Sequence, residues 1–303
     1  MDSLKNEHKK LAELINNRKV TYLDIPVHFN VGDILIYKGT EAFFDTYDID
    51  VIYRCAHENI EYKKIENSEV ILLHGGGNFG DLYSLHQNLR EDIIRKFKHK
   101  TIICLPQTIH FEDSANLAKS AALFKEHQDF HFCVRDILSV ELAKEFTENV
   151  LFMPDMAHHL HPLIDKTESG ISNVFPPKIL NLVRVDAEKQ PNTRSIVKKG
   201  FDWKNLISRE DEFAFNVYLK MNKVPWFSSR VIKLWGYQTE NIVFRSINYF
   251  NAFTVVHTDR LHGFILAALL GKEICLYDNS YGKNTNYYKA WLKDYPFITA
   301  EQS

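Results

Sequence analysis

Short apolar runs alternate with longer helical patterns through the first half of the chain. The apolar runs predict strands over residues 20–23, 50–53, 70–73, 101–105, 130–134 and 150–153. The periodic stretches predict helices over residues 3–17, 34–44, 83–97, 114–126 and 137–146. Strands that alternate with helices form parallel, doubly wound sheets, and such sheets bind ligands at the carboxyl ends of their strands.

A polar segment with three prolines, residues 158–177, interrupts this alternation, and a second α/β pattern follows it. That pattern predicts strands over 178–185, 241–245, 253–257 and 273–277, and helices over 208–221, 229–236, 264–270 and 284–293. We therefore expect an α/β protein with two Rossmann-like doubly wound domains facing a cleft. The expected boundaries are an N-terminal domain over 1–160, a linker over 161–177 and a C-terminal domain over 178–303. His158, His159 and His161 are interpreted as polar linker residues, because no cysteine or spaced aspartate completes a tetrahedral metal site beside them.

Composition narrows the classes of function. A length of 303 residues fits two domains, and a net charge of −2 provides no global basic field for nucleic acid. An anionic ligand would need a local cluster of cations. The four cysteines are widely separated and suit buried, reduced thiols. The first twenty residues are charged rather than signal-like, so we expect a cytoplasmic protein whose first helix packs on the N-terminal domain.

The most informative turn is Thr258-Asp259-Arg260-Leu261-His262-Gly263, which lies between a predicted strand and a predicted helix. Arg260 and His262 would then occupy the first turn of that helix, where unpaired N–H groups and the helix dipole favour an anion. An arginine adds charge there, and a histidine can supply a proton near neutral pH. The alternative is that both residues merely cap a buried helix.

A glycine-rich loop, His74 to Asp81, follows the strand over 70–73 and contains G-x-G-x-x-G at Gly75, Gly77 and Gly80. A dinucleotide site would place an acidic residue at the end of the next strand. That strand ends in Leu105-Pro106-Gln107-Thr108, which weakens this interpretation. No G-x-S-x-G motif supports a hydrolase. A simple structural turn does not account for the flanking polar residues, so we interpret the loop as ligand-binding.

Further polar residues lie at predicted strand ends. Asn30-Val31-Gly32-Asp33 opens a helix and is either a plain helix start or a second binding loop. Arg184 ends the strand over 178–185 and either points into the cleft or forms a surface salt bridge. Lys283 follows the last strand, and either reaches an anion at the Arg260 turn or belongs to a plain turn. Arg135-Asp136 and Pro154-Asp155 are interpreted as helix caps and interior ion pairs.

Taken in order from Asn30 to Lys283, these motifs resemble the polysaccharide pyruvyl transferase family, and most closely its bacterial exopolysaccharide-cluster members. The resemblance rests on N-x-G-D, H-G-G-G-N-F-G-D, P-Q-T, R-D, P-D, R-x-D, D-R-L-H-G and Y-G-K. It implies a two-domain fold like that of GT-B glycosyltransferases. It also implies transfer of pyruvate from phosphoenolpyruvate onto two hydroxyls of a sugar as a cyclic ketal, in exopolysaccharide or cell-surface glycan biosynthesis.

The resemblance also implies roles for single residues. Arg260, His262 and the backbone N–H of Leu261 would lie at the phosphoenolpyruvate site, with Arg184 and Lys283 as further cations, and His262 is our candidate general acid. Asp33, Asp81 and His74 would line the acceptor side, where one of the two carboxylates would be the base. The same side would include Asn30, Gly32, Gly75, Gly76, Gly77, Asn78 and Gln107.

No metal and no cofactor beyond the co-substrate phosphoenolpyruvate is expected. The expected partners are phosphoenolpyruvate and a nucleotide- or lipid-linked sugar acceptor, without nucleic acid. Peripheral association with polysaccharide assembly enzymes at the inner face of the membrane is compatible with the sequence. Two alternatives stay open, namely a GT-B glycosyltransferase that uses a nucleotide sugar and a non-catalytic metabolite-binding or scaffold protein.

Overall fold

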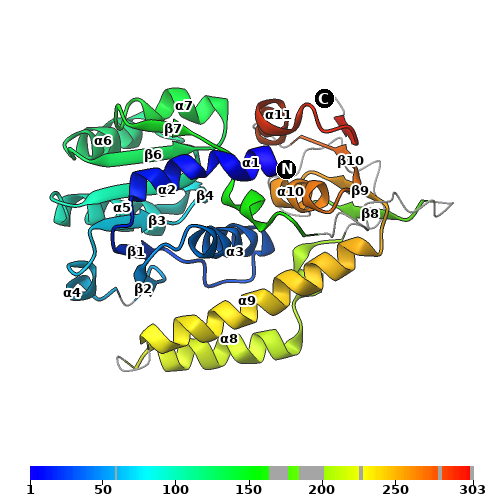
Figure 1. Ribbon diagram of the computed structural model, residues 1–303, viewed down its shortest axis with the longest axis horizontal. Helices are drawn as coiled ribbons and strands as arrows, with labels where there is room; N and C mark the ends of the chain where they lie inside the picture. The colour runs from blue at the N-terminus through cyan, green and yellow to red at the C-terminus, as the bar shows by residue number, and fades with distance from the viewer. Residues whose placement is uncertain (59, 164–176, 184–200, 225–227, 279–281, 301–303) are drawn as a thin grey trace.

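The structure is a computed structural model that describes residues 1–58, 60–163, 177–183, 201–224, 228–278 and 282–300. Two parallel β-sheets lie beside one another, each with helices against it (Figure 1). The first sheet has the order β2-β1-β3-β5-β6-β7, and β4 pairs with β5. Its strands are β1 Val20–Leu23, β2 Val51–Cys55, β3 Val70–Leu73, β4 Gly76–Phe79, β5 Thr101–Ile109, β6 Phe130–Val134 and β7 Val150–Phe152. The α/β class with parallel sheets is thereby confirmed.

The second sheet has the order β11-β10-β9-β8, and all its neighbouring strands are parallel. Its strands are β8 Ile179–Leu182, β9 Val255–Thr258, β10 Glu273–Leu276 and β11 Ile298–Ala300. The helix α10, Leu261–Leu269, links β9 to β10, and α11, Lys283–Tyr287, follows β10. This arrangement puts the Arg260 turn at the carboxyl end of β9, as the sequence predicts.

Helices cover both faces of the first sheet because successive strand residues point to opposite sides. In β3, Ile71 and Leu73 pack with residues of α5 and α6, whereas Val70 and Leu72 pack with residues of α2 and α3. These helices are α2 Lys9–Ile15, α3 Val31–Thr46, α5 Ser84–Lys96 and α6 Ser114–Lys125. Three shorter helices, α1 Asp2–Glu7, α4 Tyr62–Ile65 and α7 Ile137–Ala143, complete this half.

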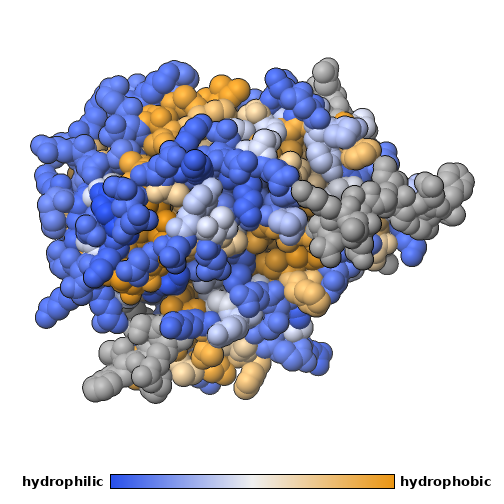
Figure 2. All heavy atoms as spheres, in the orientation of Figure 1, coloured by the Kyte–Doolittle hydropathy of each residue, from blue (hydrophilic) through white to orange (hydrophobic). Residues whose placement is uncertain are grey.

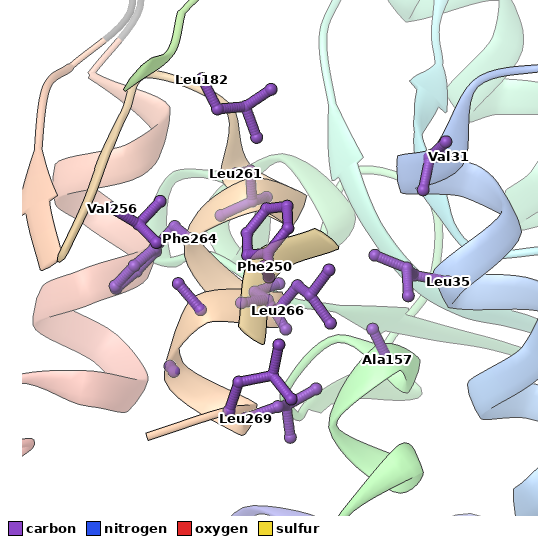
Figure 3. Close-up of a cluster of buried hydrophobic side chains, with 14 of the residues drawn as sticks. Val31, Leu35, Ala157, Leu182, Phe250, Val256, Leu261, Phe264, Leu266 and Leu269 are labelled. Carbon is purple, nitrogen blue, oxygen red and sulfur yellow. The ribbon is translucent and has the colours of Figure 1, made fainter. Parts of the chain in front are cut away.

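A third apolar core joins the two halves. Val31 and Leu35 of α3 and Ala157 of the short helix η2, Met156–Leu160, belong to the same buried cluster as Phe264 and Leu266 of α10 (Figure 3). Two polar links reinforce it. The backbone N–H of Asp155 donates to the Tyr287 hydroxyl at 3.0 Å, and Trp291 Nε1 donates to the Arg135 carbonyl at 2.8 Å. The two halves therefore hold each other in a fixed relation around the cleft.

A helical hairpin from the second half of the sequence returns to the first sheet. It consists of α8, Arg209–Asn222, and α9, Ser228–Asn251, and it runs beneath α3 in Figure 1. Tyr218 and Trp235 are buried in the core that also contains α3, and Trp235 Nε1 donates to the Pro26 carbonyl at 2.7 Å. The chain of the expected C-terminal domain thus supplies part of the core of the N-terminal half.

Three expectations about local structure are wrong. The predicted strand over 241–245 lies inside α9, because Ile242, Ser246 and Phe250 recur at helical spacing and are buried. The predicted helix over 3–17 is two helices, α1 and α2, that meet at the buried residue His8, whose Nε2 lies 3.0 Å from the Pro154 carbonyl oxygen.

The third concerns the expected polar linker. His158 and His159 belong to η2 and are buried against the protein, with at most 1% exposure, so neither is a solvated linker residue. The larger part of the predicted linker, residues 164–176, lies outside the described residues. Among the helices that the structure describes, none combines the length and apolarity needed to cross a membrane.

Candidate active site

A cavity of about 480 Å³ lies between the two halves. From the first half it is lined by residues that follow β1, β3, β5 and β6, and from the second half by residues that follow β9 and β10. The expected cleft at the carboxyl ends of the strands is therefore present. The residues discussed below that line it are Asn30, Asp33, Gly77, Asn78, Arg135, Arg260, Leu261, His262 and Lys283.

His262, Asp155 and Arg135 form a chain across the two halves. Nε2 of His262 lies 3.3 Å from Oδ2 of Asp155, and the same oxygen accepts a hydrogen bond from Nη1 of Arg135. Burial alone would raise the pKa of the Asp155 carboxyl, but the charges of His262 and Arg135 hold this pKa well below its usual range. An ionised Asp155 can accept a hydrogen bond from Nε2 of His262, which favours the tautomer with the proton on that nitrogen.

Gly32 lets the histidine approach the first turn of α3. A Cβ atom at position 32 would lie 2.5 Å from Nδ1 of His262, so any side chain there would displace the imidazole. Asn30 caps the same helix, since its Oδ1 accepts from the Gly32 N–H at 3.0 Å while its Nδ2 donates to Asp33 at 2.8 Å. The N-x-G-D motif is thus both a helix start and a wall of the cavity.

Arg135 presents one nitrogen to the cavity in a fixed orientation. Its side chain is 1% exposed, its Nε donates to Thr108 Oγ1 at 3.1 Å, and its Nη1 is bound to Asp155. The remaining nitrogen, Nη2, has no hydrogen-bond partner among the described residues. A Cβ atom at Gly77 would lie 3.0 Å from this Nη2 and 2.5 Å from Nζ of Lys283. The two cationic nitrogens therefore lie close together over Gly77, where a side chain would displace them.

Arg260 lies at the start of α10 beside an acidic residue. Its Nη2 donates to both carboxylate oxygens of Asp202, at 2.9 and 3.0 Å, and its side chain is 17% exposed. Leu261 and His262 follow it on the first turn of α10 and also line the cavity. The R-L-H triplet therefore faces the cavity, as the sequence predicts.

The glycine-rich loop divides into a supporting side and a cavity side. His74 is buried beneath it, with Nδ1 2.5 Å from the Tyr22 hydroxyl, and burial lowers the pKa of its imidazole to about 4. Gln107 is also buried and donates to the His74 carbonyl at 2.7 Å. Asn78 faces the cavity while its Oδ1 accepts from Nη2 of Arg90 at 2.6 Å.

The backbone conformation requires glycine at two positions of this loop. A Cβ atom at Gly75 would lie 2.8 Å from the Pro106 carbonyl oxygen, and Gly76 has a φ of +132°, which L residues rarely adopt. The short strand β4, which the sequence analysis does not predict, begins at Gly76. These positions shape the loop, and Gly77 and Asn78 are the ones that reach the cavity.

The two candidate bases differ in position. Asp81 accepts hydrogen bonds from the N–H groups of Glu112 and Asp113 and from Asn116, at 2.8 to 3.2 Å, and it does not line the cavity. Asp33 does line it. Of the two candidate bases, only Asp33 is therefore at the cavity, and its role as base stays a prediction. Arg184 lies outside the described residues, so its placement stays a prediction.

With this geometry established, comparison with known proteins identifies the family. The sequence pattern of the polysaccharide pyruvyl transferase family matches residues 30–281. The chain belongs to this family.

Among relatives, the chain is 35% identical to EpsO of Bacillus subtilis (strain 168) over 98% of this chain and 92% of that one. It is 30% identical to Pyruvyl transferase 1 of Schizosaccharomyces pombe, over 91% and 70% of the two chains. The crystal structure of KP1_0663, a functionally uncharacterised protein of Klebsiella pneumoniae, shares the fold with a TM-score of 0.62 at 24% identity, covering 99% and 98% of the two chains. The polysaccharide pyruvyl transferases carry out pyruvyl transfer to polysaccharide, so this protein is a transferase of that general kind.

Two residues that the sequence analysis assigned to caps and ion pairs also contribute to this cavity or contact its lining. Asp155 does cap η2 through its Oδ1, which accepts from the Ala157 N–H at 2.8 Å, and Asp136 caps α7. The same Asp155 also holds His262, and Arg135 also faces the cavity. The available signal was their position after adjacent strands, since β6 and β7 are paired. Among the described residues, no group of three or more His, Cys, Asp or Glu side chains could hold a metal ion.

Proposed function

We propose that this polysaccharide pyruvyl transferase takes pyruvate from phosphoenolpyruvate and attaches it to two hydroxyls of a sugar as a cyclic ketal. The observation that carries the proposal is the His262–Asp155 pair in a cavity that also presents Arg135, Arg260 and Lys283. A histidine held by a buried carboxylate is suited to proton transfer, and three cations in one cavity suit a ligand with two anionic groups. The site is assigned to the biosynthesis of exopolysaccharide or cell-surface glycan, and the GT-B-like arrangement is part of the same proposal.

The donor would lie across the junction of the two halves. One of its anionic groups would occupy the space above Gly77, between Nη2 of Arg135 and Nζ of Lys283. The other would lie at the first turn of α10, against Arg260 and the Leu261 N–H. Arg260 is paired with Asp202 in the structure, so donor binding there would compete with or rearrange that pair. Arg184 is kept as a further donor-binding cation.

His262 would act as general acid in the first step. Its proton would pass to the methylene carbon of phosphoenolpyruvate, which becomes a methyl group, and the carbon that bears the phosphate ester would become an oxocarbenium-like centre. One sugar hydroxyl would add to that centre and lose its proton to a base, for which Asp33 has the better position. A second hydroxyl would then displace inorganic phosphate and close the ketal. General acid–base catalysis of this kind contributes about 10²–10⁴-fold in rate.

The acceptor would occupy the part of the cavity away from Arg135. Asn30, Asp33 and Asn78 supply hydrogen-bonding groups there, and Tyr83 and Leu138 supply apolar surface. A sugar ring has both kinds of surface, so this mixed lining suits it. We place the protein in the cytoplasm, with the acceptor linked to a nucleotide or to a lipid at the inner face of the membrane.

The first experiment measures thermal unfolding with phosphoenolpyruvate, UDP and GDP, each in large excess. A ligand at 100 times its Kd stabilises a protein by about 2.7 kcal/mol, which is readily detected. We expect stabilisation by phosphoenolpyruvate that is lost in Gly77→Ala, because the added methyl group fills the space between the two cations. Gly236→Ala, a helical glycine whose Cβ would meet only the Tyr37 hydroxyl at 3.3 Å, is the matched control and should respond like the wild type.

The second experiment measures phosphate release from phosphoenolpyruvate with a panel of nucleotide- and lipid-linked sugars. We expect His262→Ala to retain the stabilisation by phosphoenolpyruvate and to lose about 10²–10⁴-fold in rate. Stabilisation by a nucleotide and none by phosphoenolpyruvate would instead indicate a glycosyltransferase. Binding of phosphoenolpyruvate by the wild type with no phosphate release across the panel would indicate a binding protein.

A further inference from the structure

The outward face of the α8–α9 hairpin exposes large apolar side chains. Phe213 is 72% exposed, Tyr237 67% and Phe244 66%, and Val217 and Leu234 lie on the same outer side of their helices. The inner face of the hairpin is already packed, since Tyr218, Val231, Ile232 and Trp235 are buried in the core beneath it. Figure 2 shows hydrophobic residues among hydrophilic ones along the lower edge of the molecule, where Figure 1 draws the two helices. Exposed apolar surface of this kind marks an interaction site.

These apolar residues form a stripe because of helical spacing. Phe213 and Val217 are four residues apart on α8, and Leu234, Tyr237 and Phe244 are three and seven apart on α9. The two helices are antiparallel neighbours, so both rows run along the same hairpin. Together they present a two-helix face to the outside.

Charges are separated along the same hairpin. Lys220 and Lys223 at the end of α8 and Lys233 near the start of α9 lie close to the connection between the helices. Glu210 and Glu212 at the start of α8 lie at the opposite end, where Glu240 of α9 pairs with Lys38, Asp211 of α8 pairs with Arg245 of α9, and Arg209 is a further exposed cation. One end of the hairpin is therefore basic, and the other carries a small excess of acidic side chains.

We propose that this face binds a second copy of the chain in an isologous dimer. A two-fold axis through the middle of the hairpin places the two hairpins antiparallel, so that the lysine end of one copy meets the glutamate end of its partner. The same axis superposes the two apolar stripes, with Tyr237 near the centre. Self-complementarity of this kind is what a two-fold interface requires, whereas a lipid surface or an unrelated protein gives no reason for the opposed charges.

The size of the face sets the expected affinity. The overlapping part of the two helices is about 20 Å long and about 20 Å wide, from the rise per residue and the diameter of a helix. Such a face covers about 400 Å² per partner, half of the about 800 Å² that a standard specific interface buries, and this size is typical of weak, transient contacts. We therefore expect a dimer that dissociates in the micromolar range.

Sedimentation velocity of the full chain between about 1 and 100 μM tests the proposal across the range expected for a small interface. We expect a reversible monomer–dimer equilibrium that the double variant Tyr237→Glu, Phe244→Glu weakens at least tenfold, because it introduces like charges into the stripe. Leu85→Glu is the matched control, since Leu85 is a helical leucine of α5 that is 56% exposed away from the hairpin. A protein that stays monomeric at 100 μM, or a dimer that the double variant leaves unchanged, overturns the proposal.

A charge-reversal pair tests the antiparallel arrangement. The variant Lys220→Glu, Lys233→Glu and the variant Glu210→Lys, Glu212→Lys should each be monomeric, and an equimolar mixture should form a heterodimer. Circular dichroism confirms that each variant is folded. Failure of the mixture to associate overturns the arrangement. Flotation of the monomeric wild type with anionic vesicles, abolished by the double variant Tyr237→Glu, Phe244→Glu, would assign the face to a lipid surface instead.

Discussion

The buried carboxylate of Asp155 contacts two basic side chains, one from each half of the protein. His262 reaches it from α10 and Arg135 from the end of β6. Truncating one member of a buried charged set leaves the others without compensation, which costs about 3–5 kcal/mol. The same carboxylate fixes the tautomer of the proposed acid, so its removal should affect rate as well as stability.

We predict that Asp155→Asn remains folded at low temperature, is destabilised by about 3–5 kcal/mol and loses about 10²-fold or more in kcat. The KM for phosphoenolpyruvate should change little, because Arg135, Arg260 and Lys283 are kept. Urea unfolding and steady-state phosphate release provide the two measurements. Asp211→Asn is the control, since Asp211 is a buried carboxylate of α8 that pairs with Arg245 at 2.7 Å and does not line the cavity, so this variant should keep kcat. Full activity in Asp155→Asn would contradict the proposed role of the pair.

The same residues show where sequence analysis stops. Arg260 and His262 could be predicted because a strand, a turn and a helix are consecutive and place them together. Arg135 and Asp155 are 20 positions apart. A helix begins close after each of them, so the local sequence indicates no more than helix capping in these two segments. Their contact arises only because β6 and β7 pair in parallel and bring two strand ends side by side.

At the scale of elements, the packing of α3 on η2 positions that carboxylate. Gly39 of α3 contacts the backbone of η2, and a Cβ atom there would overlap the Met156 carbonyl oxygen. Gly39→Ala gains about 1 kcal/mol of helix propensity. The overlap is with backbone, which cannot rotate away, and overpacking of this kind typically costs about 1–3 kcal/mol.

We predict that Gly39→Ala lowers the free energy of unfolding by up to about 2 kcal/mol, the overpacking cost less the gain in helix propensity, and also lowers kcat, because η2 begins directly after Asp155. Gly236→Ala in α9 is the matched control, since its added methyl group would meet a hydroxyl 3.3 Å away. Its stability should be equal to or above that of the wild type. Chemical unfolding of both variants under one condition tests the difference, and equal destabilisation of the two would contradict the assignment.

Elements whose residue pattern fits only a strand or only a helix were predicted well. Elements whose pattern fits both were not. The central strands β1, β3 and β5 are buried on both faces, and their sequences are nearly continuous apolar runs. Residues 241–245 also include an apolar pair, Ile242 and Val243, and a short run of this kind does not distinguish a strand from a buried helix segment. Contacts between the hairpin and the core of the first half favour the helix, and these contacts join residues that are distant in sequence.

At the scale of the whole molecule, the order of elements was predictable, but the return of α8 and α9 to the first half was not. The sequence assigns these helices to the second α/β unit because they follow β8. Their buried face instead completes a core whose other members come from α2, α3 and the first sheet. The two halves are thus stabilised together, through this core and through the one around α10. Conditions that disturb a buried group at either junction should therefore affect unfolding of the entire protein.

Several buried histidines make that unfolding sensitive to acid. Burial lowers the pKa of His8 and of His74 to about 4 and the pKa values of His158 and His159 to about 3. The unfolded chain has a histidine pKa near 6.5. Below that pH the unfolded state binds protons that the folded state does not, so the stabilisation is complete above pH 6.5 and is lost as pH falls toward 4. Each of these histidines should lower the free energy of unfolding by about 1.4 kcal/mol between pH 7.5 and 5.5.

His158 offers the cleanest test, because its ring stacks on Tyr287 of the other half and neither ring nitrogen has a hydrogen-bond partner among the described residues. His158→Phe keeps the stacked ring and removes the titrating group. We predict that it is at least as stable as the wild type at pH 7.5 and loses about 1.4 kcal/mol less between pH 7.5 and 5.5. His99→Phe is the control, since the His99 side chain is 64% exposed and folding hardly changes its solvation. Urea unfolding of the wild type and both variants at pH 7.5 and 5.5 gives the free energy of unfolding of each variant relative to the wild type at each pH. An unchanged loss in His158→Phe would mean that the junction between the halves does not contain the acid-sensitive group.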